Sequence, residues 1–582
     1  MLKHLVFILS VTIPSFVIAS RLDPIIVSSK TNQSQSELTV SSEIISEDQI
    51  ELKPSTEVVD ILRSQSDINI SQTGGPGSAY SIFIRGAESR HTVVLIDGVR
   101  VNDPTSLDGS FNMASLSSLD IEKVEIIKGP QSLLHGSDAI GGVINIITNK
   151  GSSPGGKISI EGGVQKEIAS TTTVYGKNGV FYLNGFYNES NIISSVKNGD
   201  EKDLGLNRGL TLNYAHVFDE VELQWQAKLL NSYKQTDGFK VDSDINYSKA
   251  QNQIYFQKLN YKSFSHKISY IKSDRFERFG ATTSSDYSGS RVAQELNYNL
   301  EHSNIKTIIG LNHEYSTYEQ TGLDEVKTNL YEGFISSTLK YQKYFTTFGA
   351  RQTNHEEFGD FTSFNAGVGL NLENRKQIKI NYATGFKAPS AYQLFVDEPF
   401  VKGNDELDPE KSRSVSITYL KQGTSGYEVA LYDTHIDDFI NYDSTTTTYF
   451  NSNSLRTYGI DLGFYQKYKK FLFEQSLALN KSHDSSKKNA LKRPKAKANL
   501  NVFGKIDDKQ GIGLEWSWVS SQFDSGDREL VAFDLVNLTY KYKFNDFDLK
   551  ASIRNLFDRD YEEAKDYETI GLNGSLKIVM NY

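Results

Sequence analysis

Residues 535–544, with the sequence Leu-Val-Asn-Leu-Thr-Tyr-Lys-Tyr-Lys-Phe, alternate apolar or aromatic side chains with mostly polar ones. Successive side chains of an extended strand point to opposite faces, so this alternation separates two surfaces. One face comprises Val536, Leu538, Tyr540, Tyr542 and Phe544, and the other comprises Leu535, Asn537, Thr539, Lys541 and Lys543. The pattern predicts a β-strand with one apolar face and one wet face.

The same alternation recurs from about residue 151 to the C-terminus, in segments separated by clusters of Gly, Asn, Asp and Ser. Two further examples have the apolar faces Ile378, Ile380 and Tyr382, and Leu576, Ile578, Met580 and Tyr582. We count about 22 such segments, an even number within the range of bacterial outer-membrane barrels. Strands of about ten residues exceed the usual five or six of globular sheets and match a tilted membrane span, which argues against a soluble all-β array such as a propeller.

The N-terminus has the pattern of a secretory signal peptide over residues 1–19. Lys3 and His4 precede an apolar run that ends with the small residues Val17 and Ala19. About 15 apolar residues are fewer than the roughly 20 that a spanning helix needs. No later run is long enough to span a membrane as a helix, so an exported chain of this kind is either soluble or a β-barrel.

Composition excludes several classes of function. A chain of 582 residues exceeds one ordinary core, so at least two structural units are expected. With no cysteine, disulfides, thiolate metal sites and cysteine redox chemistry are excluded. A net charge of -10 offers no basic surface of the kind that binds nucleic acid.

A barrel of about 22 strands encloses a lumen too wide for its own side chains to fill, so the barrel needs a plug. Residues 31–150 have a different, mixed α/β texture. Ser46 and Gln49 have capping-box spacing, a second helix is predicted from Thr56, and residues 93–96 and 143–147 are continuous apolar runs typical of buried strands.

Several motifs of this chain resemble those of the TonB-dependent outer-membrane receptors. In the plug they are residues 82–86, 93–100, 121–130 and 136–148, and in the barrel they are residues 382–390, 407–412 and 555–561. The resemblance implies an all-β fold, an antiparallel transmembrane β-barrel of about 22 strands with an N-terminal α/β plug domain in its lumen. It also implies a monomer in lipid contact, exported to the bacterial outer membrane. The expected division is a signal peptide at 1–19, a coupling segment at 20–30, the plug at 31–150 and the barrel at 151–582.

The resemblance assigns the plug motif to Arg85, Gly86, Asp97, Gly98, Lys128, Gly129, Gly141 and Gly142. Glycines permit left-handed backbone or a close backbone approach, although ordinary turn chemistry accounts for many of them. Arg85 and Lys128 adjoin apolar strands, and a buried charge needs a partner. We therefore expect carboxylates of the barrel wall to pair with both, with surface exposure as the alternative.

The segment Asp23, Pro24, Ile25, Ile26, Val27 is similar to the family's coupling box, which implies that the inner-membrane-anchored protein TonB pulls on it. A β-branched run offers its backbone to a sheet edge, which is recognition by strand addition. The alternative is an ordinary first strand of the plug. No phosphate-binding Gly-Lys-Ser/Thr loop and no His-Glu-x-x-His motif is present, as expected for transport powered from the inner membrane.

Within the family, the chain is most similar to cobalamin transporters, through residues 71–77 before the motif at 82–86 and through its short outer loops. The expected function is TonB-dependent import of a large scarce nutrient, with cobalamin or a related corrinoid first and a ferric siderophore or haem as the alternative. Ligand contacts are assigned to Gly77, Ser78, Tyr80, Asp108 and Phe111. Tyr80 and Phe111 either stack on a flat ligand or pack against the barrel wall.

The resemblance also implies a calcium site in the early outer loops, for which the carboxylates of Asp200, Glu201, Asp203, Asp237 and Asp242 are the available hard oxygen ligands. The alternative is a solvated acidic loop. No other cofactor is required. An outer-membrane enzyme is a weaker hypothesis, because adjacent Ser137 and Asp138 with His135 nearby do not make a triad. A passive porin ranks last, because it needs neither plug nor coupling box.

Overall fold

The structure is a computed structural model that describes residues 25–26, 30, 33–54, 57–106, 109–113, 116–151, 153–176, 179–191, 193–237, 242–398 and 401–582. Side chains are described for all of these except residue 25. The predicted signal peptide, Asp23, Pro24 and Val27 of the coupling box, and Asp108 lie outside the described residues.

Twenty-two antiparallel strands form a closed barrel, as the sequence predicted. They are β10 (Gly155–Gly163), β11 (Gln165–Tyr175), β12 (Gly179–Asn191), β13 (Leu204–Phe218), β14 (Val221–Gln235), β15 (Tyr247–Tyr261), β16 (Phe264–Phe279), β17 (Thr283–His302), β18 (Ile305–Gln320), β19 (Leu323–Tyr341), β20 (Tyr344–His355), β21 (Gly359–Leu372), β22 (Lys376–Lys387), β25 (Glu410–Lys421), β26 (Ser425–Asp443), β27 (Thr448–Tyr468), β28 (Phe471–Asp484), β29 (Ala496–Lys505), β30 (Gln510–Val519), β33 (Phe533–Lys543), β34 (Phe547–Arg554) and β35 (Asn573–Asn581). The barrel closes where β10 pairs with β35, with Ile160 opposite Ile578.

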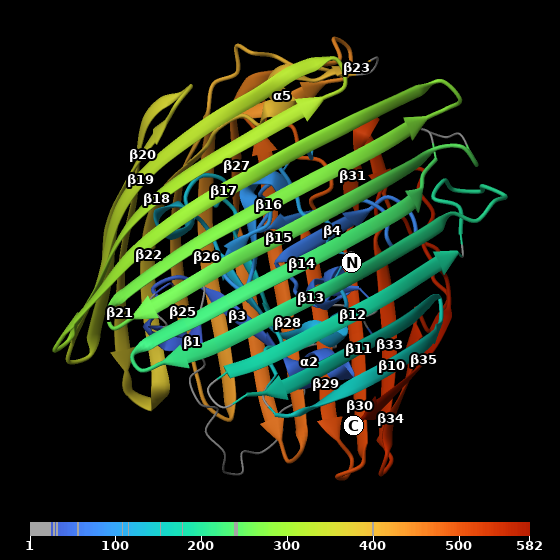
Figure 1. Cartoon of the computed structure of the whole chain (residues 1–582), viewed down its shortest axis with the longest axis horizontal. Helices are drawn as coiled ribbons and strands as arrows, with labels where there is room; N and C mark the ends of the chain where they lie inside the picture. The colour runs from blue at the N-terminus through green and yellow to red at the C-terminus, as the bar shows by residue number, and fades with distance from the viewer. Residues whose placement is uncertain are drawn as a thin grey trace.

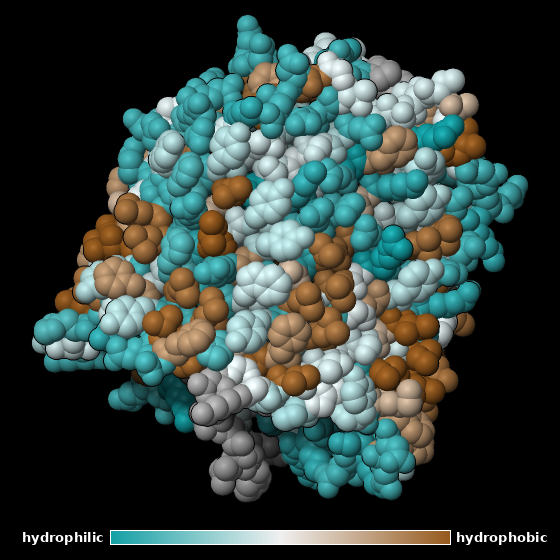
Figure 2. Space-filling view, viewed as in Figure 1, coloured by the Kyte–Doolittle hydropathy of each residue, from teal (hydrophilic) through white to brown (hydrophobic). Residues whose placement is uncertain are grey.

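The predicted alternation separates the two faces of the wall. On β22, Ile380 is 50% exposed while its neighbours Lys379 and Asn381 are 3% and 4% exposed. On the surface, hydrophobic residues gather in a band across the lower half of the view, with hydrophilic residues above and below it (Figure 2). The apolar face therefore points out of the barrel and the polar face points to its interior.

Most of the strands are longer than the predicted ten residues. β17 has 20 residues and β27 has 21. The added length continues beyond the apolar residues on one side, where the outward side chains of β17 are polar, as at Asp286, Ser288 and Ser290. Alternation persists there between polar outer residues and buried inner ones, so sequence hydrophobicity alone missed the strand ends.

The two ends of the barrel differ. Short connections join the strands at one end, such as residues 219–220, 342–343 and 469–470, and β35 ends there. We name this end the turn rim. The other end, the loop rim, carries the longer connections, among them residues 388–409 with α5 (Ala391–Phe395), β23 (Asp397–Glu398) and β24 (Val401–Lys402), and a small hairpin of β31 (Gln522–Asp524) and β32 (Arg528–Leu530).

The plug lies inside the barrel, behind the strands drawn in green in Figure 1. Its five-stranded sheet has the order β3-β8-β9-β6-β7, in which only β6 and β9 are parallel neighbours. These strands are β3 (Ser42–Ser46), β6 (Thr92–Ile96), β7 (Val99–Arg100), β8 (Ile121–Lys128) and β9 (Gly142–Thr148). Two hairpins, β1 (Ile25–Ile26) with β2 (Gln33–Ser34), and β4 (Ile68–Gln72) with β5 (Tyr80–Ile84), accompany it.

Three short helices complete the plug: α2 (Glu47–Leu52), α3 (Val58–Arg63) and α4 (Ser132–His135). The predicted capping box is confirmed, because Gln49 Oε1 accepts the backbone N–H of Ser46 at 3.0 Å. The second helix begins at Val58, with Glu57 as its N-cap. Among the described residues, no helix is long and apolar enough to cross a membrane.

The main hydrophobic core joins plug and barrel. Val59 and Leu62 of α3 and Ile144 of β9 share one buried cluster with inward-facing Phe186 of β12 and Leu230 of β14. The plug therefore completes its core against the inner wall, which fixes its position in the lumen.

Candidate ligand-binding and coupling site

Arg85 anchors the plug to the barrel. It follows β5 with a positive φ of 50° and is buried. Its Nε donates to Asp461 Oδ2 of β27 at 2.8 Å, and its guanidinium lies 4.7 Å from the centre of the Tyr432 ring. The prediction that Arg85 pairs with a barrel carboxylate is confirmed. A Cβ on the next residue, Gly86, would collide with the Ser482 hydroxyl of β28, so glycine permits this close approach.

The corresponding prediction for Lys128 is wrong. Its ammonium pairs with Asp67 Oδ2 at 2.6 Å and with Glu43 Oε2 at 3.1 Å, and both partners belong to the plug. Because β3 lies beside β8 in the sheet, Glu43 reaches Lys128 without help from the barrel wall. Lys128 therefore holds plug elements together.

The remaining motif residues form turns and tight contacts. Asp97 and Gly98 make a turn with φ of 51° and 78°, and Asp97 accepts the backbone N–H of Thr148 at 3.1 Å and the Gln226 amide of β14 at 2.9 Å. Of the other glycines, Gly129 has a φ of 88°, a Cβ on Gly141 would lie 2.8 Å from Ala87 Cβ, and a Cβ on Gly142 would lie 2.5 Å from the Ile127 carbonyl oxygen. The motif thus shapes the plug more than it exposes reactive groups.

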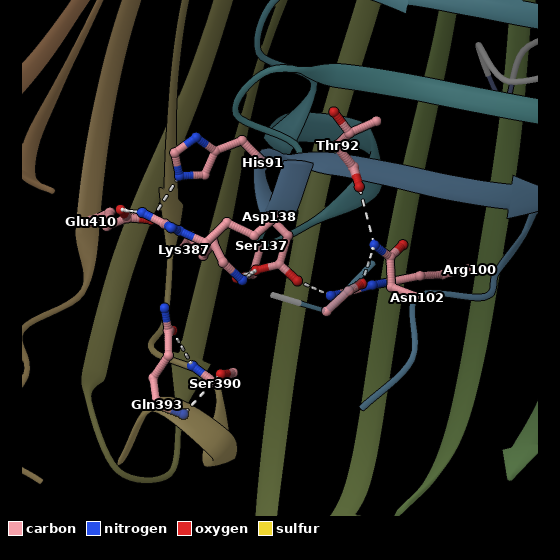
Figure 3. A network of polar contacts seen from close by, with 12 residues as sticks. His91, Thr92, Arg100, Asn102, Ser137, Asp138, Lys387, Ser390, Gln393 and Glu410 are labelled. Carbon is pink, nitrogen blue, oxygen red and sulfur yellow. Dashed lines mark hydrogen bonds and ion pairs between the residues drawn. The ribbon is translucent and has the colours of Figure 1, made fainter. Parts of the chain in front are cut away.

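A buried contact between His91 and Glu410 was missed in the sequence (Figure 3). His91 Nε2 lies 2.8 Å from Glu410 Oε2, and Arg90 Nη2 donates to Glu410 Oε1 at 2.9 Å. Burial lowers the pKa of His91, against the opposing effect of the Glu410 carboxylate. Glu410 lies in the barrel motif at 407–412, which was the one sequence signal for this anchor.

Asp138 is the centre of a third network (Figure 3). It pairs with Arg100 of β7 and accepts Lys387 Nζ of β22 at 3.0 Å. The Ser137 hydroxyl donates to the same carboxylate at 3.0 Å. Ser137 therefore has the geometry of an ion-pair support, without an imidazole acting on its hydroxyl in the described contacts.

A cavity of about 130 Å³ separates the plug from the wall and from the start of the 388–409 connection. Its cationic lining is Arg100, Arg291 and Lys387, with Tyr318 and His355 beside them. Arg291 Nη1 donates to the Asn102 carbonyl oxygen at 2.9 Å. This cavity joins plug, wall and loop rim at one place.

The lining of this cavity includes Ser106 and Gly109, but none of the predicted ligand residues that the structure describes, which are Gly77, Ser78, Tyr80 and Phe111. Phe111 is 3% exposed and belongs to the hydrophobic core, and Tyr80 Oη donates to its carbonyl oxygen at 3.2 Å. For Phe111 the structure supports the packing alternative. The Gly77 N–H donates to Glu57 Oε1 at 2.6 Å, and Ser78 is buried with no partner for its hydroxyl among the described residues.

The described part of the coupling segment is docked inside the barrel. Ile26 pairs with Gln33 and is fully buried in a cluster with Val93 and Val143 of the plug sheet. Nearby, Lys30 Nζ lies 2.9 Å from Glu295 Oε2 of β17. The segment thus contacts both plug and wall, as either interpretation of it requires.

Three of the five predicted calcium ligands converge. Glu201, Asp237 and Asp242 each place a carboxylate oxygen within 4.8 Å of the others. Asp203 instead accepts the Ser195 N–H at 2.7 Å, and the Asp200 N–H donates to Asp242 Oδ2 at 2.9 Å. Desolvation and the neighbouring acids raise the pKa of Glu201 to about 8. The trio offers hard oxygen ligands of the type that calcium takes.

Two sequence families match the chain. The family described as "TonB-dependent Receptor Plug Domain" matches residues 34–143, and the one described as "TonB dependent receptor-like, beta-barrel" matches residues 159–556. The chain belongs to the TonB-dependent receptors. Short turns of such barrels face the periplasm and longer loops face the outside, so the turn rim is periplasmic and the protein is an outer-membrane protein.

Solved structures of several siderophore and ferric-chelate receptors share this fold. The siderophore receptor PirA from Acinetobacter baumannii has a TM-score of 0.81 at 15% identity, covering 97% of this chain and 100% of that one. A mutant of the ferric enterobactin receptor PfeA from Pseudomonas aeruginosa, in complex with enterobactin, has 0.79 at 15%, covering 94% and 100%. The ferric-catecholate import receptor Fiu from E. coli K12 has 0.78 at 14%, covering 94% and 98%. Such identities establish the fold, so the predicted likeness to cobalamin transporters stays a prediction.

Proposed function

We propose that this TonB-dependent receptor imports a ferric siderophore across the outer membrane. The observation that carries the choice of cargo is the cavity between plug, wall and loop rim, where Arg100, Arg291 and Lys387 lie beside the carboxylates of Asp103, Asp138 and Glu314. An anionic chelate is attracted by guanidinium and ammonium groups in a partly desolvated site. The names of the solved receptors with the same fold, which describe siderophore and ferric-catecholate receptors, agree with this cargo.

Each of these cations already has a carboxylate partner, which balances its positive charge before a ligand binds. Arg291 Nε pairs with Glu314 Oε1 at 2.9 Å, and Lys387 pairs with Asp138. A ligand anion would compete for the same N–H groups, and it would enter from the loop rim because the plug fills the lumen below. Tyr318 supplies an aromatic face to the same cavity.

Energy for import is proposed to come through the segment Asp23 to Val27, pulled by TonB. The docking of Ile26 against the plug sheet supports this proposal, because a force on the segment would act directly on plug residues. Strand addition to a TonB sheet would require this segment to leave its pairing with β2.

Cobalamin or a related corrinoid is the second candidate cargo. The specific observation in its favour is the convergence of Glu201, Asp237 and Asp242. These residues lie in the outer loops for which the likeness to cobalamin transporters implies a calcium site. We propose that calcium binds this trio and orders the loops at 193–203 and 242–246. Haem remains a cargo to include in the binding panel.

The test is equilibrium binding to the purified, detergent-solubilised protein of ferric enterobactin, haem, and cobalamin with and without calcium. We expect saturable binding of the ferric catecholate, weakened about tenfold in Lys387→Gln by loss of a charge-assisted contact. Lys327→Gln is the matched control, because Lys327 lies on the exposed outer side of β19. Binding of cobalamin alone would identify a corrinoid as the cargo and would leave the proposed TonB-dependent transport unchanged.

A further inference from the structure

A second, larger cavity opens at the periplasmic turn rim, between the plug helix α2 and the inner wall of the barrel. It has a volume of about 850 Å³ and extends from β27 across β30 to β33. Eight lysines and five carboxylates line it. We name this cavity the lysine bay.

Strand register shows which lysines face the lumen. A Cβ on Gly511 of β30 would lie 2.9 Å from Leu52 of α2, so Gly511 faces the plug. Lys505 of β29 and Lys541 of β33 are its cross-strand partners and share that face. Lys543, two residues further along β33, faces the same way.

The acidic helix α2 occupies one side of the bay. Glu51 pairs with Lys541 at 2.8 Å, and Glu47 lies 3.9 Å from Lys157 of β10. The end of the helix rests directly on β30, because a Cβ on Gly513 would collide with the Leu52 carbonyl oxygen. In Figure 1, α2 lies at the lower end of the plug, near β29 and β30.

Lysines outnumber carboxylates in the lining of the bay, and Asp507 and Asp508 lie among the lysines. The ammonium groups of Lys467, Lys505 and Lys543 are exposed and form no ion pair with any described residue. Deeper in the lumen, by contrast, Lys53 pairs with Glu515 at 2.7 Å and Lys577 pairs with Glu167 at 2.8 Å. Field lines concentrate in such a cleft and raise the local concentration of anions.

We propose that the lysine bay is an exit site for anionic cargo. In the resting protein the carboxylates of α2 pair with lysines of the bay, and the anionic cargo replaces these carboxylates during its passage to the periplasm. The inference rests on the proposed function and narrows its cargo to a negatively charged chelate. When α2 moves off the wall, Lys541 loses Glu51 and keeps Asp548 of β34 at 3.1 Å, so the departing anion can take the place of one of its two carboxylate partners.

Anionic lipid headgroups are the competing ligand for a basic rim. The register disfavours them, because Lys505 and Lys543 point to the lumen while the residues next to them, Ile506 and Phe544, are the exposed apolar ones. Lipid binding to outward lysines is therefore a different proposal, and the test below separates the two.

The test compares cell-surface binding with uptake of 55Fe-enterobactin in cells that carry the full-length receptor. We expect Lys505→Glu/Lys543→Glu to bind as the wild type does and to take up iron about tenfold more slowly, since charge in a cleft acts on rates. Lys505→Arg/Lys543→Arg keeps the charge and should keep uptake. Lys343→Glu, on the turn between β19 and β20 across the barrel, is the matched control and should be silent.

Unchanged uptake in the double glutamate variant would overturn the exit site. So would a parallel loss in Lys343→Glu, which would indicate a lipid or assembly effect of the whole rim. Folding of each variant is checked by its amount in the outer membrane.

A second measurement is independent of the cargo. The chain has no native cysteine, so Lys505→Cys carries a single thiol. We expect it to react several-fold faster with a sulfonate-bearing thiosulfonate reagent than with its ammonium analogue, and Lys543→Glu should abolish that preference. Equal rates would overturn the bay as an anion site. Failure of the wild type to bind ferric enterobactin would instead count against the proposed function alone.

Discussion

Lys30 and Glu295 form an ion pair of 2.9 Å that ties the chain next to the coupling box to strand β17 of the barrel. Glu295 also holds Lys267 of β16 at 2.6 Å, so one wall carboxylate serves two cations. Both side chains of the Lys30–Glu295 pair are largely buried. Breaking such a pair leaves an uncompensated charge, which gives the pair more weight than a surface contact has.

Loss of this tie should loosen the docked segment. In Lys30→Gln, we expect the thiol of Ile26→Cys, at a position that is fully buried, to react with maleimide about tenfold faster than in the parent. Lys306→Gln, which breaks an exposed pair with Glu301 at the same rim, is the control. Equal labelling rates would show that Lys30 does not hold the segment.

Deletion of residues 23–27 should separate binding from transport. The deletion removes none of the cations of the proposed ligand site, Arg100, Arg291 and Lys387, so binding should persist. Uptake of 55Fe-enterobactin should stop, because strand addition to TonB would lose its peptide. Continued uptake by the deletion variant would refute the coupling role.

Removal of the carboxylate that holds Arg85 should destabilise plug docking. Asp461→Asn leaves a buried guanidinium with a weaker partner, at an expected cost of about 3 kcal/mol in the free energy of opening. Hydrogen exchange of β5 amides measures this cost. Asp433→Asn is the matched control: its pair with Arg456 lies on the exposed face of the same two strands and should contribute less than about 1 kcal/mol.

The plug should weaken as pH rises from about 4.5 to about 7. Burial, with a further effect of Asp60, raises the pKa of Glu57 from 4.5 to about 7. Between these values the folded plug keeps a proton on Glu57 that the unfolded chain has lost, so the contribution of Glu57 to stability is greatest below pH 4.5 and declines up to about pH 7. We expect exchange of β4 and β5 amides, corrected for intrinsic rates, to report a loss of roughly 2 kcal/mol from pH 5 to 8. Glu57→Gln should remove this slope, and an unchanged slope would exclude Glu57 as its source.

Calcium should bind the trio and not its neighbours. Glu201→Gln should weaken equilibrium binding of 45Ca to the purified protein at least tenfold, because one of three converging carboxylates is lost. Asp203→Asn should bind normally, because that side chain accepts from Ser195 instead. Absence of 45Ca binding to the wild type would contradict the calcium site and favour the alternative of a solvated acidic loop.

The barrel could be predicted from the sequence because its signal is local. At Lys379, Ile380 and Asn381, side chains that face the lumen alternate with one that faces lipid. This alternation can be recognised in the sequence without knowing which distant residues are neighbours. The helix start at Ser46 was predictable for the same reason, since the capping box acts within one turn.

The site could not be predicted to the same depth because it depends on which strands meet. His91 and Glu410 are 319 residues apart in the chain, and only barrel closure around the plug brings them together. Lys128 pairs with Glu43 because the plug sheet places β3 next to β8, and with Asp67, which precedes β4, and neither neighbour is encoded by a local pattern. The aromatic side chain of Phe111 is suited either to stacking on a ligand or to packing in a core, and in the structure it packs in the core.

The core shared between α3 of the plug and the inner wall at Phe186 and Leu230 determines the order in which plug and barrel can complete their folding. The plug is synthesised before the barrel, yet its residues lack part of their apolar surroundings until the barrel wall has formed. The wall closes only when β35, near the end of the chain, pairs with β10. The domain that is synthesised first is therefore the last whose apolar surface becomes fully covered.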